Sequence, residues 1–387
     1  MKILHVIPGV APRYGGPSQA IIEMCRALQE EGMEVLIATT DADGDGRLAV
    51  TTRVETTYQG VPTIFFSRQV SEAFKYSHDL ACWLNANVDS FDIVHIHAVF
   101  SHSSVAAARA CVRKKIPYIV RPLGSLDPWS LKQKRFAKNI LWCMAVKEML
   151  QGASAVHYTT TGEKRLAEDG LGINSGVVVP LGVQQHVPTP EWDGFQPRIS
   201  SLGNSPYVLL LSRIHPKKNI ESLLEAFSFV TERTQYRGWK LVVAGDGEPH
   251  YVNRLKELAR QCCGERVLFT GWLDGKRKAA VLKGASLVVL PSYQENFGLS
   301  VVEAMASRIP VLVSKQVNLS EEIAAAGAGW IVDLERGSLQ EALAEALEDR
   351  EERVKRGISG ENLVRSRYTW PAVAKSLHDL YCRCEEV

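Results

Sequence analysis

Residues 286–306 read SLVVLPSYQENFGLSVVEAMA, a pattern that predicts a strand, a tight turn and a helix in this order. The short apolar run at 286–290 is typical of a strand that is buried on both faces of a parallel sheet. The apolar spacing after Asn296 predicts a helix that begins directly behind a tight turn. A strand, a turn and a helix in this order leave backbone N–H groups and a positive dipole end at the turn, which suits an anion.

The same alternation of short strands and amphipathic helices runs along the whole chain. It predicts parallel sheets that are covered by helices on both faces and joined by right-handed crossovers. In the first half we expect strands at residues 3–7, 35–39, 63–66, 93–97, 118–120, 155–158 and 177–179. In the second half we expect them at residues 208–211, 241–244, 267–270, 287–290, 311–313 and 330–332.

A segment rich in Pro, Gly, Ser and Asn separates the two halves. It covers residues 184–205, has no hydrophobic periodicity and predicts a linker. The chain has 387 residues with 45% hydrophobic content, which is enough for two cores. We therefore expect two doubly wound, Rossmann-like α/β domains, residues 1–183 and 206–369. Ligands of such sheets bind beyond the carboxyl ends of the strands, so the domains should face each other across a cleft.

Composition excludes several classes of protein. Lys+Arg 45 against Asp+Glu 43 gives a net charge of +2, which does not favour a nucleic-acid partner. The eight cysteines lack zinc-site spacing and are expected to be reduced thiols. The apolar run at 3–7 is too short for a signal peptide, and no run approaches the ~20 apolar residues of a spanning helix. We expect a cytoplasmic protein.

Two cations follow the strand expected at 208–211. Arg213 and Lys218 flank a Pro-containing turn, and a helix is expected to begin at Ile220. Cations at the carboxyl end of a strand, beside a helix N-terminus, can hold a diphosphate, with arginine as a fork and lysine as a point charge. The alternative is an ordinary basic surface loop.

Two glycine-containing turns also follow strands. Gly245-Asp246-Gly247 comes after the strand at 241–244, and its glycines allow a close backbone approach, although such a sequence also forms ordinary turns. Gly15-Gly16 precedes the first helix and can present N–H groups to phosphate oxygens. The latter is neither G-x-G-x-x-G nor a P-loop, and a plain loop is the alternative.

Two acids flank the turn of the opening stretch. Glu295 lies before the turn, and Glu303 lies within the helix behind it. A nucleotide sugar needs acceptors for ribose hydroxyls at one end and for hexose hydroxyls at the other, with the diphosphate between them. The two acids and the two cations match these needs. A capped helix with two solvated glutamates is the alternative.

Together these motifs resemble the retaining glycosyltransferases of family 4, which have the two-domain GT-B fold. The resemblance spans nearly the whole chain and is most specific in E-x7-E, written here from Glu295 to Glu303 with Phe297-Gly298 inside. It implies that Arg213 and Lys218 neutralise the donor diphosphate, that Glu295 contacts the hexose and that Glu303 contacts the ribose. The implied catalytic residues are Arg213, Lys218 and Glu295. The implied donor-binding residues are Gly15, Gly16, Gly245, Asp246, Asn296, Phe297, Gly298, Leu299 and Glu303.

The resemblance has further implications. The last helix, residues 370–387, should pack back on the first domain. No cofactor or metal is needed, and the donor phosphate itself takes the acceptor proton on the front face. Many relatives have a histidine where this chain has Leu123, so the acceptor-side polar group must come from elsewhere. The candidates are His97, His102, Arg121 and Asp127.

His95 and His97 lie two residues apart on an expected strand, so both side chains share one face. Two histidines can be metal ligands. A third ligand at suitable spacing is missing from the sequence, so we expect no metal site here.

Residues 128–150 form a basic, amphipathic segment in which we expect one helix. Such a helix can lie on an anionic membrane, which would suit a lipid-linked acceptor at the inner face of the cell membrane. The alternative is the solvated face of a domain helix.

The expected activity is hexose transfer, with retention, from a nucleotide diphosphate sugar to a hydroxyl of a glycan or lipid-linked acceptor, as in the biosynthesis of cell-surface polysaccharides. Two other classes stay open. One is a nucleotide-sugar epimerase of the same fold, and the other is a catalytically silent nucleotide-sugar-binding protein. A dinucleotide oxidoreductase lacks its glycine fingerprint.

Overall fold

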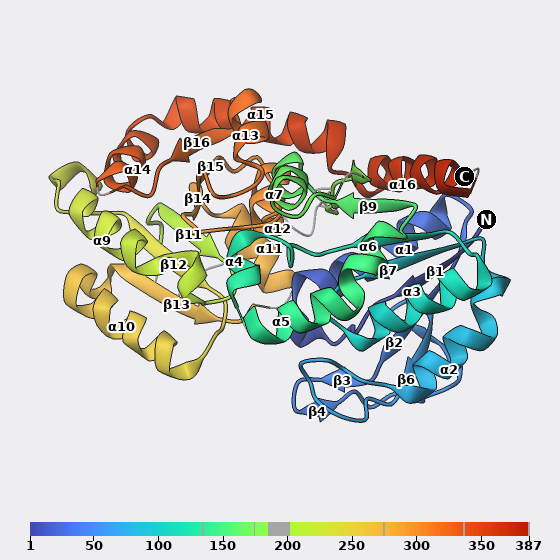
Figure 1. Cartoon of the computed structure of the whole chain (residues 1–387). Helices are drawn as coiled ribbons and strands as arrows, with labels where there is room; N and C mark the ends of the chain where they lie inside the picture. Colours follow the sequence, from blue (N-terminus) through green and yellow to red (C-terminus); the bar gives the residue numbers. More distant parts are fainter. Residues whose placement is uncertain (134, 174, 185–201, 274, 336, 386–387) are drawn as a thin grey trace. The chain divides into compact units, whose positions relative to one another are not determined.

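The structure is a computed structural model that describes residues 1–133, 135–173, 175–184, 202–273, 275–335 and 337–385 (Figure 1). The chain divides into two compact units. The N-terminal unit comprises residues 1–182 and 370–387, and the C-terminal unit comprises residues 183–369. Most of the expected linker lies outside the described residues.

The N-terminal unit is built on an eight-stranded sheet with the order β10-β9-β8-β7-β1-β2-β6-β5. All neighbours are parallel except β5 and β6, which are antiparallel. Every strand expected in this half is present, with ends that differ by two residues or fewer. The strands are β1 (Lys2–Val6), β2 (Glu34–Thr40), β5 (Glu55–Tyr58), β6 (Val61–Phe66), β7 (Ile93–His97), β8 (Tyr118–Arg121), β9 (Ala155–Tyr158) and β10 (Gly176–Val178).

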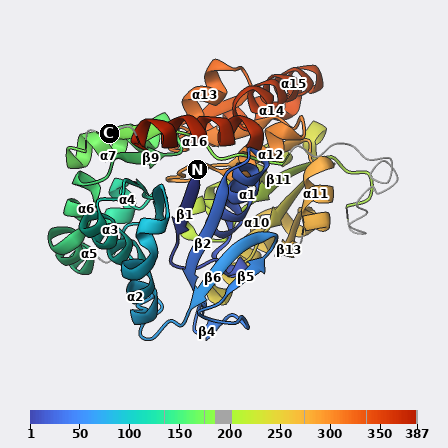
Figure 2. The ribbon, with the colours of Figure 1, turned by 90° about the vertical axis from the view of Figure 1, so that its right-hand side faces the viewer.

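Helices cover both faces of this sheet. One face packs against α2 (His78–Asn87), α3 (His102–Lys114), α6 (Lys147–Gln151) and α7 (Thr161–Leu171), with a continuous apolar core between them. On the other face, α1 (Gly16–Glu30) lies beside α16 (Trp370–Glu385), as Figure 2 shows. The apolar stripe of α16, which includes Val373, Leu377 and Leu380, is buried. The end of the chain thus completes the N-terminal unit.

The C-terminal unit is built on a six-stranded parallel sheet with the order β13-β12-β11-β14-β15-β16. Each strand lies where the sequence predicts it. They are β11 (Tyr207–Leu211), β12 (Lys240–Ala244), β13 (Val267–Gly271), β14 (Leu287–Leu290), β15 (Val311–Ser314) and β16 (Gly329–Val332). The helices are α9 (Ile220–Thr231), α10 (Pro249–Cys263), α11 (Gly275–Lys283), α12 (Leu299–Ala306), α13 (Ser320–Ala325), α14 (Ser338–Glu348) and α15 (Arg350–Arg367).

Each sheet has one point at which the strand order reverses. In the C-terminal unit it lies between β11 and β14, because β12 is added on one side of β11 and β14 on the other. In the N-terminal unit it lies between β1 and β7. The loops beyond the carboxyl ends of the two strands diverge at such a point, and doubly wound folds bind their ligands there.

The expectation of one helix over residues 128–150 is wrong. The structure has α4 (Pro128–Lys132), α5 (Arg135–Leu141), a π-helical turn (Trp142–Val146) and then α6. Gln133 is extended, with φ −75° and ψ 128°, which ends α4. Neither glycine nor proline marks the break, so the sequence reads as one continuous amphipathic pattern.

Short polar elements were also missed. The hairpin of β3 (Ala42–Asp43) and β4 (Gly46–Arg47) and the edge strand β5 carry few apolar residues. Hydrophobic periodicity therefore gives them no signal.

Candidate active site

The donor residues predicted in the second half of the chain lie around the strand reversal of the C-terminal unit, whereas Gly15 and Gly16 belong to the N-terminal unit. β11 and β14 are adjacent, with Leu209 opposite Val288. Their loops stay paired beyond the sheet, because the Tyr293 N–H donates to the Lys217 carbonyl at 2.9 Å. This pairing brings Lys218 into an ion pair with Glu295, and both side chains are largely buried. A cation and an acid that lie 77 positions apart in sequence thus share one site.

Arg213 lies in the same loop as Lys218 and is exposed. His215, between them, accepts a hydrogen bond from the Lys217 N–H through Nδ1 at 3.1 Å and so caps the turn. Partial burial, followed by the charges of Arg213, Lys217 and Lys218, lowers the pKa of His215. The positive potential is therefore concentrated at the carboxyl end of β11, where an anion would be attracted.

Glu303 lies one turn inside α12 and forms an ion pair with Lys278 of α11, with Nζ and Oε1 2.6 Å apart. Sequence reasoning missed Lys278. Its only signal is the basic run from Lys276 to Lys278, which gives no indication of the partner on α12. Each acid of the E-x7-E motif therefore has a lysine partner.

The turn between the two acids is shaped by two residues. Gly298 has φ +73° and ψ 57°, a left-handed conformation that favours glycine, and α12 begins at the next residue, Leu299. Phe297 is buried and packs edge to face on Tyr368 with ring centroids 5.8 Å apart. Phe297 therefore anchors the turn in the core, while Asn296 and Leu299 on either side are half-buried.

The Gly245-Asp246-Gly247 turn lies against the Arg213 loop. The Ile214 N–H donates to the Asp246 carbonyl at 2.8 Å. Gly245 has φ +145°, and a Cβ atom there would lie 1.8 Å from the Ser212 carbonyl oxygen. The glycine lets the two backbones touch and so fixes the loop that carries Arg213.

We expect Gly245→Ala to lower the free energy of unfolding of the C-terminal unit by about 1–3 kcal/mol, because a backbone atom must move to admit the methyl group. Gly238→Ala is the matched control, since a Cβ atom at Gly238 meets nothing within 4 Å. Urea denaturation measures both variants. An unchanged midpoint for Gly245→Ala would contradict the close contact.

The Gly15-Gly16 turn lies beyond the carboxyl end of β1, at the reversal point of the N-terminal sheet. Gly15 has φ +72°, and α1 begins at Gly16. The neighbouring Tyr14 hydroxyl donates to Glu72 at 2.6 Å and accepts from the Gly44 N–H at 3.0 Å. Burial and the Glu72 carboxylate raise the pKa of Tyr14 to about 12. Tyr14 therefore ties the turn to two other loops.

Three of the four candidates for the acceptor side, Asp127, His102 and His97, have hydrogen-bond partners of their own. Asp127 caps α4 by accepting from the Ser130 N–H at 2.7 Å and from the Ser130 hydroxyl at 2.8 Å. His102 accepts from the Ser77 N–H at 3.2 Å. His97 and Arg121 are opposite each other on β7 and β8, and both are buried. Burial lowers the pKa of Arg121 to about 10, so it is charged at neutral pH.

The turn that carries Leu123 is held by a buried acid that sequence reasoning missed. Leu123 and Gly124 have φ +58° and +69°. The Gly124 N–H donates to Glu163 at 2.8 Å, and the same carboxylate accepts from the N–H and hydroxyl of Thr159, both at 2.8 Å. Glu163 therefore fixes this turn to the end of β9.

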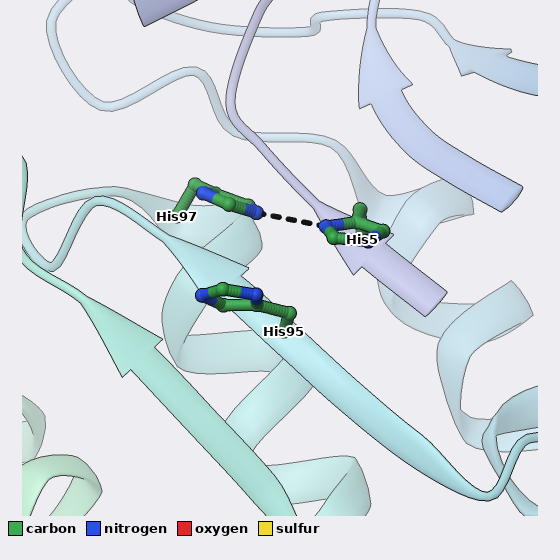
Figure 3. A group of neighbouring side chains, drawn as sticks. All are labelled: His5, His95 and His97. Carbon is green, nitrogen blue, oxygen red and sulfur yellow. Dashed lines mark hydrogen bonds between the residues drawn. The ribbon is translucent and has the colours of Figure 1, made fainter. Parts of the chain in front are cut away.

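The expectation that His95 and His97 have no third partner is wrong. His5 on β1 is opposite His95 on β7, so it lies beside both rings, as Figure 3 shows. One nitrogen from each ring lies within 4.8 Å of the others. The group of His5, His95 and His97 could not be predicted from the spacing of histidines, because His5 is 92 positions from His97.

These histidines form a buried hydrogen-bonded layer. His157 Nε2 donates to the Val179 carbonyl at 2.7 Å, so its Nδ1 accepts from His95 Nε2 at 3.2 Å. His95 Nδ1 then accepts from the Tyr381 hydroxyl at 2.9 Å, and His5 Nδ1 lies 3.1 Å from His97 Nε2. The rings of His95 and His97 are stacked at 26°, so their in-plane lone pairs run side by side. The rings of this layer thus contact one another as hydrogen-bond partners.

Comparisons with known proteins cover both units. Residues 195–362 match the family described as glycosyl transferases group 1, and residues 15–182 match the glycosyl transferase 4-like domain. An uncharacterised glycosyltransferase of Methanocaldococcus jannaschii is 24% identical over 309 residues, which is 76% of either chain.

Two further proteins are similar over different extents. The GDP-mannose-dependent alpha-(1-6)-phosphatidylinositol monomannoside mannosyltransferase of Mycobacterium tuberculosis is 29% identical over 189 residues, 46% of this chain and 48% of that enzyme. This alignment therefore spans about half of the relative. The crystal structure of HepE from Anabaena in complex with UDP and glucose has a TM-score of 0.78 at 19% identity and covers 99% of both chains. That likeness establishes the GT-B fold.

Proposed function

This chain belongs to the family of glycosyl transferases group 1, and we propose that it transfers a hexose, with retention, from a nucleotide diphosphate sugar to a hydroxyl of a glycan or a lipid-linked acceptor. The observation that carries the proposal is the pairing of Lys218 with Glu295 at the strand reversal of the C-terminal unit. The pair places Lys218, which we propose binds the diphosphate, beside Glu295, which we propose contacts the sugar hydroxyls. A relative named for GDP-mannose and a neighbour bound to UDP and glucose support a donor of this class.

In the proposed reaction, the bond between the anomeric carbon and the phosphate oxygen breaks as the acceptor oxygen approaches on the same face. Negative charge builds on the leaving phosphate, and the cations of Arg213 and Lys218 stabilise it. The phosphate oxygen takes the proton of the acceptor hydroxyl, so the path needs no protein nucleophile. Glu295 orients the hexose through its hydroxyls.

Two side-chain cations supply the charge that a metal ion provides in other diphosphate sites. We therefore propose that the transfer needs neither metal nor cofactor. Turnover is expected to be unchanged after dialysis against EDTA, and a loss that is restored by added Mg²⁺ would contradict this part of the proposal.

Lys278 is proposed as a positioning residue that holds Glu303 ready for the ribose hydroxyls. Lys278→Gln should raise KM for the donor about fivefold, the equivalent of about 1 kcal/mol, with little change in kcat. Lys278→Arg should restore KM, and Lys276→Gln on the same helix is the control because Lys276 is exposed. Steady-state kinetics at varied donor concentration measures KM and kcat for each variant. An unchanged KM would remove Lys278 from donor binding.

We also propose peripheral contact with an anionic membrane at the cytoplasmic face, as in the biosynthesis of cell-surface polysaccharides. Phe136, Ile140 and Met144 recur every four residues and are 80%, 46% and 67% exposed. Basic residues of α4 and α5 lie in the same segment as this apolar stripe, a combination typical of helices that lie on anionic lipid. Among the described residues, none of the helices is long and apolar enough to cross a bilayer. Sedimentation with anionic and neutral vesicles tests the contact, and Phe136→Ser should weaken it.

The activity is tested with a panel of nucleotide sugars. A donor present at 100 times its Kd should stabilise the chain by about 2.7 kcal/mol, which a thermal shift detects. The donor so identified is then incubated with candidate acceptors, and the products are separated. Nucleoside diphosphate together with a glycosylated acceptor supports the proposal. An epimerised nucleotide sugar formed without an acceptor would instead assign an isomerase, and binding without any product would assign a silent binding protein.

A further inference from the structure

The N-terminal unit carries a groove that neither the donor site nor the sequence motifs explain. Its volume is about 360 Å³, within the range of small-molecule sites. The apolar part of its lining is Phe100, Leu131, Trp142 and Leu171, and the basic part is Lys132, Arg135 and Lys138.

The break between α4 and α5 creates this groove. Because α4 ends at Lys132, the chain turns, and α5 lies against α4 instead of continuing it. Lys138 Nζ donates back to the Ser130 carbonyl, which ties the two helices together. The same ammonium lies over the Phe100 ring, 5.1 Å from its centroid, and so joins the pair to the loop beyond β7.

The place of the groove in the fold suits a substrate. Phe100 lies three residues beyond His97, the last residue of β7. β7 is one of the two strands at the reversal point of this sheet, so the groove opens at the edge where doubly wound folds bind ligands. Asp127, a candidate for the acceptor side, caps the helix that forms one wall. The groove therefore lies where an acceptor is expected.

The charge and polarity of the lining restrict the occupant. Among the described residues, the groove is lined by three cations and no acid, and most of its exposed lining is apolar. A sugar or a nucleotide is polar over its whole surface and would leave the apolar part without a partner. An occupant with an apolar body and an anionic head satisfies both parts, because the head can pair with Lys132 and Arg135 while the body is removed from water.

We propose that this groove binds a phosphate-bearing lipid, with the alkyl chain along Leu131 and Trp142 and the phosphate at Lys132 and Arg135. The exposed stripe of Phe136, Ile140 and Met144 is carried by the same helical segment, so a lipid can enter from a membrane that this stripe contacts. The proposal rests on the proposed function in that it makes such a lipid the acceptor class.

The test uses the full chain and three probes below micelle-forming concentration: dodecyl phosphate, dodecyl maltoside and inorganic phosphate. Isothermal titration should give dodecyl phosphate an affinity at least about tenfold higher than that of either other probe. The double variant Lys132→Gln/Arg135→Gln should lose about tenfold in affinity for dodecyl phosphate. The control Lys115→Gln/Lys147→Gln removes two exposed cations that do not line the groove and should bind like the native chain.

Two results would overturn the proposal. One is equal affinity for dodecyl phosphate and dodecyl maltoside, and the other is unchanged binding by Lys132→Gln/Arg135→Gln. Trp142→Ala should also weaken the binding of dodecyl phosphate. Unchanged binding by this variant would show that the alkyl chain does not lie in the groove. The thermal shift with nucleotide sugars is measured on the same variants and should stay native, so failure of the lipid site is distinguished from failure of the donor site.

Discussion

Lys218→Ala is expected to lower turnover by a factor of 10²–10³, about 2.7–4 kcal/mol of transition-state stabilisation. Lys218 lies at the carboxyl end of β11, and its ammonium is held against Glu295 in a largely buried pair. A cation fixed before the reaction begins stabilises the leaving phosphate without reorganisation. Arg213→Ala, which removes the second cation of the loop, should have an effect of the same order.

Lys217→Ala is the matched control, because it removes the same charge one position away and keeps the backbone bond to Tyr293. Rates are measured at saturating donor, and circular dichroism checks that each variant is folded. Near-native turnover of Lys218→Ala or Arg213→Ala would show that the diphosphate lies elsewhere.

The N-terminal unit is expected to lose stability steeply as the pH falls below about 6.5. The layer contains His5, His95, His97 and His157, and burial is the main cause that lowers the pKa of each. The pKa of His5 and that of His157 are lowered to about 3. In the unfolded chain these groups titrate near 6.5. Between these values the unfolded state binds more protons, so the free energy of unfolding is fully present above about 6.5 and decreases as the pH falls toward 3.

Within this window, each such histidine lowers the free energy of unfolding by about 1.4 kcal/mol for each unit by which the pH falls. Urea unfolding of native chain and of His157→Asn between pH 7 and pH 5 measures the slope. The variant should lose the contribution of one histidine to this slope, whereas His250→Asn should keep the native slope because His250 lies in the C-terminal unit. A native slope no steeper than that of His157→Asn would mean that the layer is protonated in the folded state.

The strands, and the loops that follow them, could be predicted because their signals are local. Buried parallel strands are continuous apolar runs, and loops at their carboxyl ends carry the polar residues, so Lys218 and Glu295 could be placed at one edge of one sheet. Their pairing follows from the adjacency of β11 and β14. The order of strands in a sheet cannot be predicted from any single segment of the sequence.

The features that were missed depend on that order or on packing. His5 joins His95 because β1 pairs with β7, and Lys278 meets Glu303 because α11 lies near α12. The break at Gln133 is marked by neither glycine nor proline, and the contacts of α5 with α4 and of Lys138 with Phe100 join residues that the sequence alone does not bring together. Asp127 and Glu163 were not predicted in their positioning roles, because a capping or loop-holding carboxylate looks the same in sequence as a substrate ligand.

The most direct test of the account is a crystal structure of the chain with the nucleotide sugar that stabilises it most. We expect the diphosphate within hydrogen-bond distance of Arg213 and Lys218, the ribose hydroxyls at Glu303 and the hexose at Glu295. A nucleotide bound away from the loops that follow β11 and β14 would contradict the assignment.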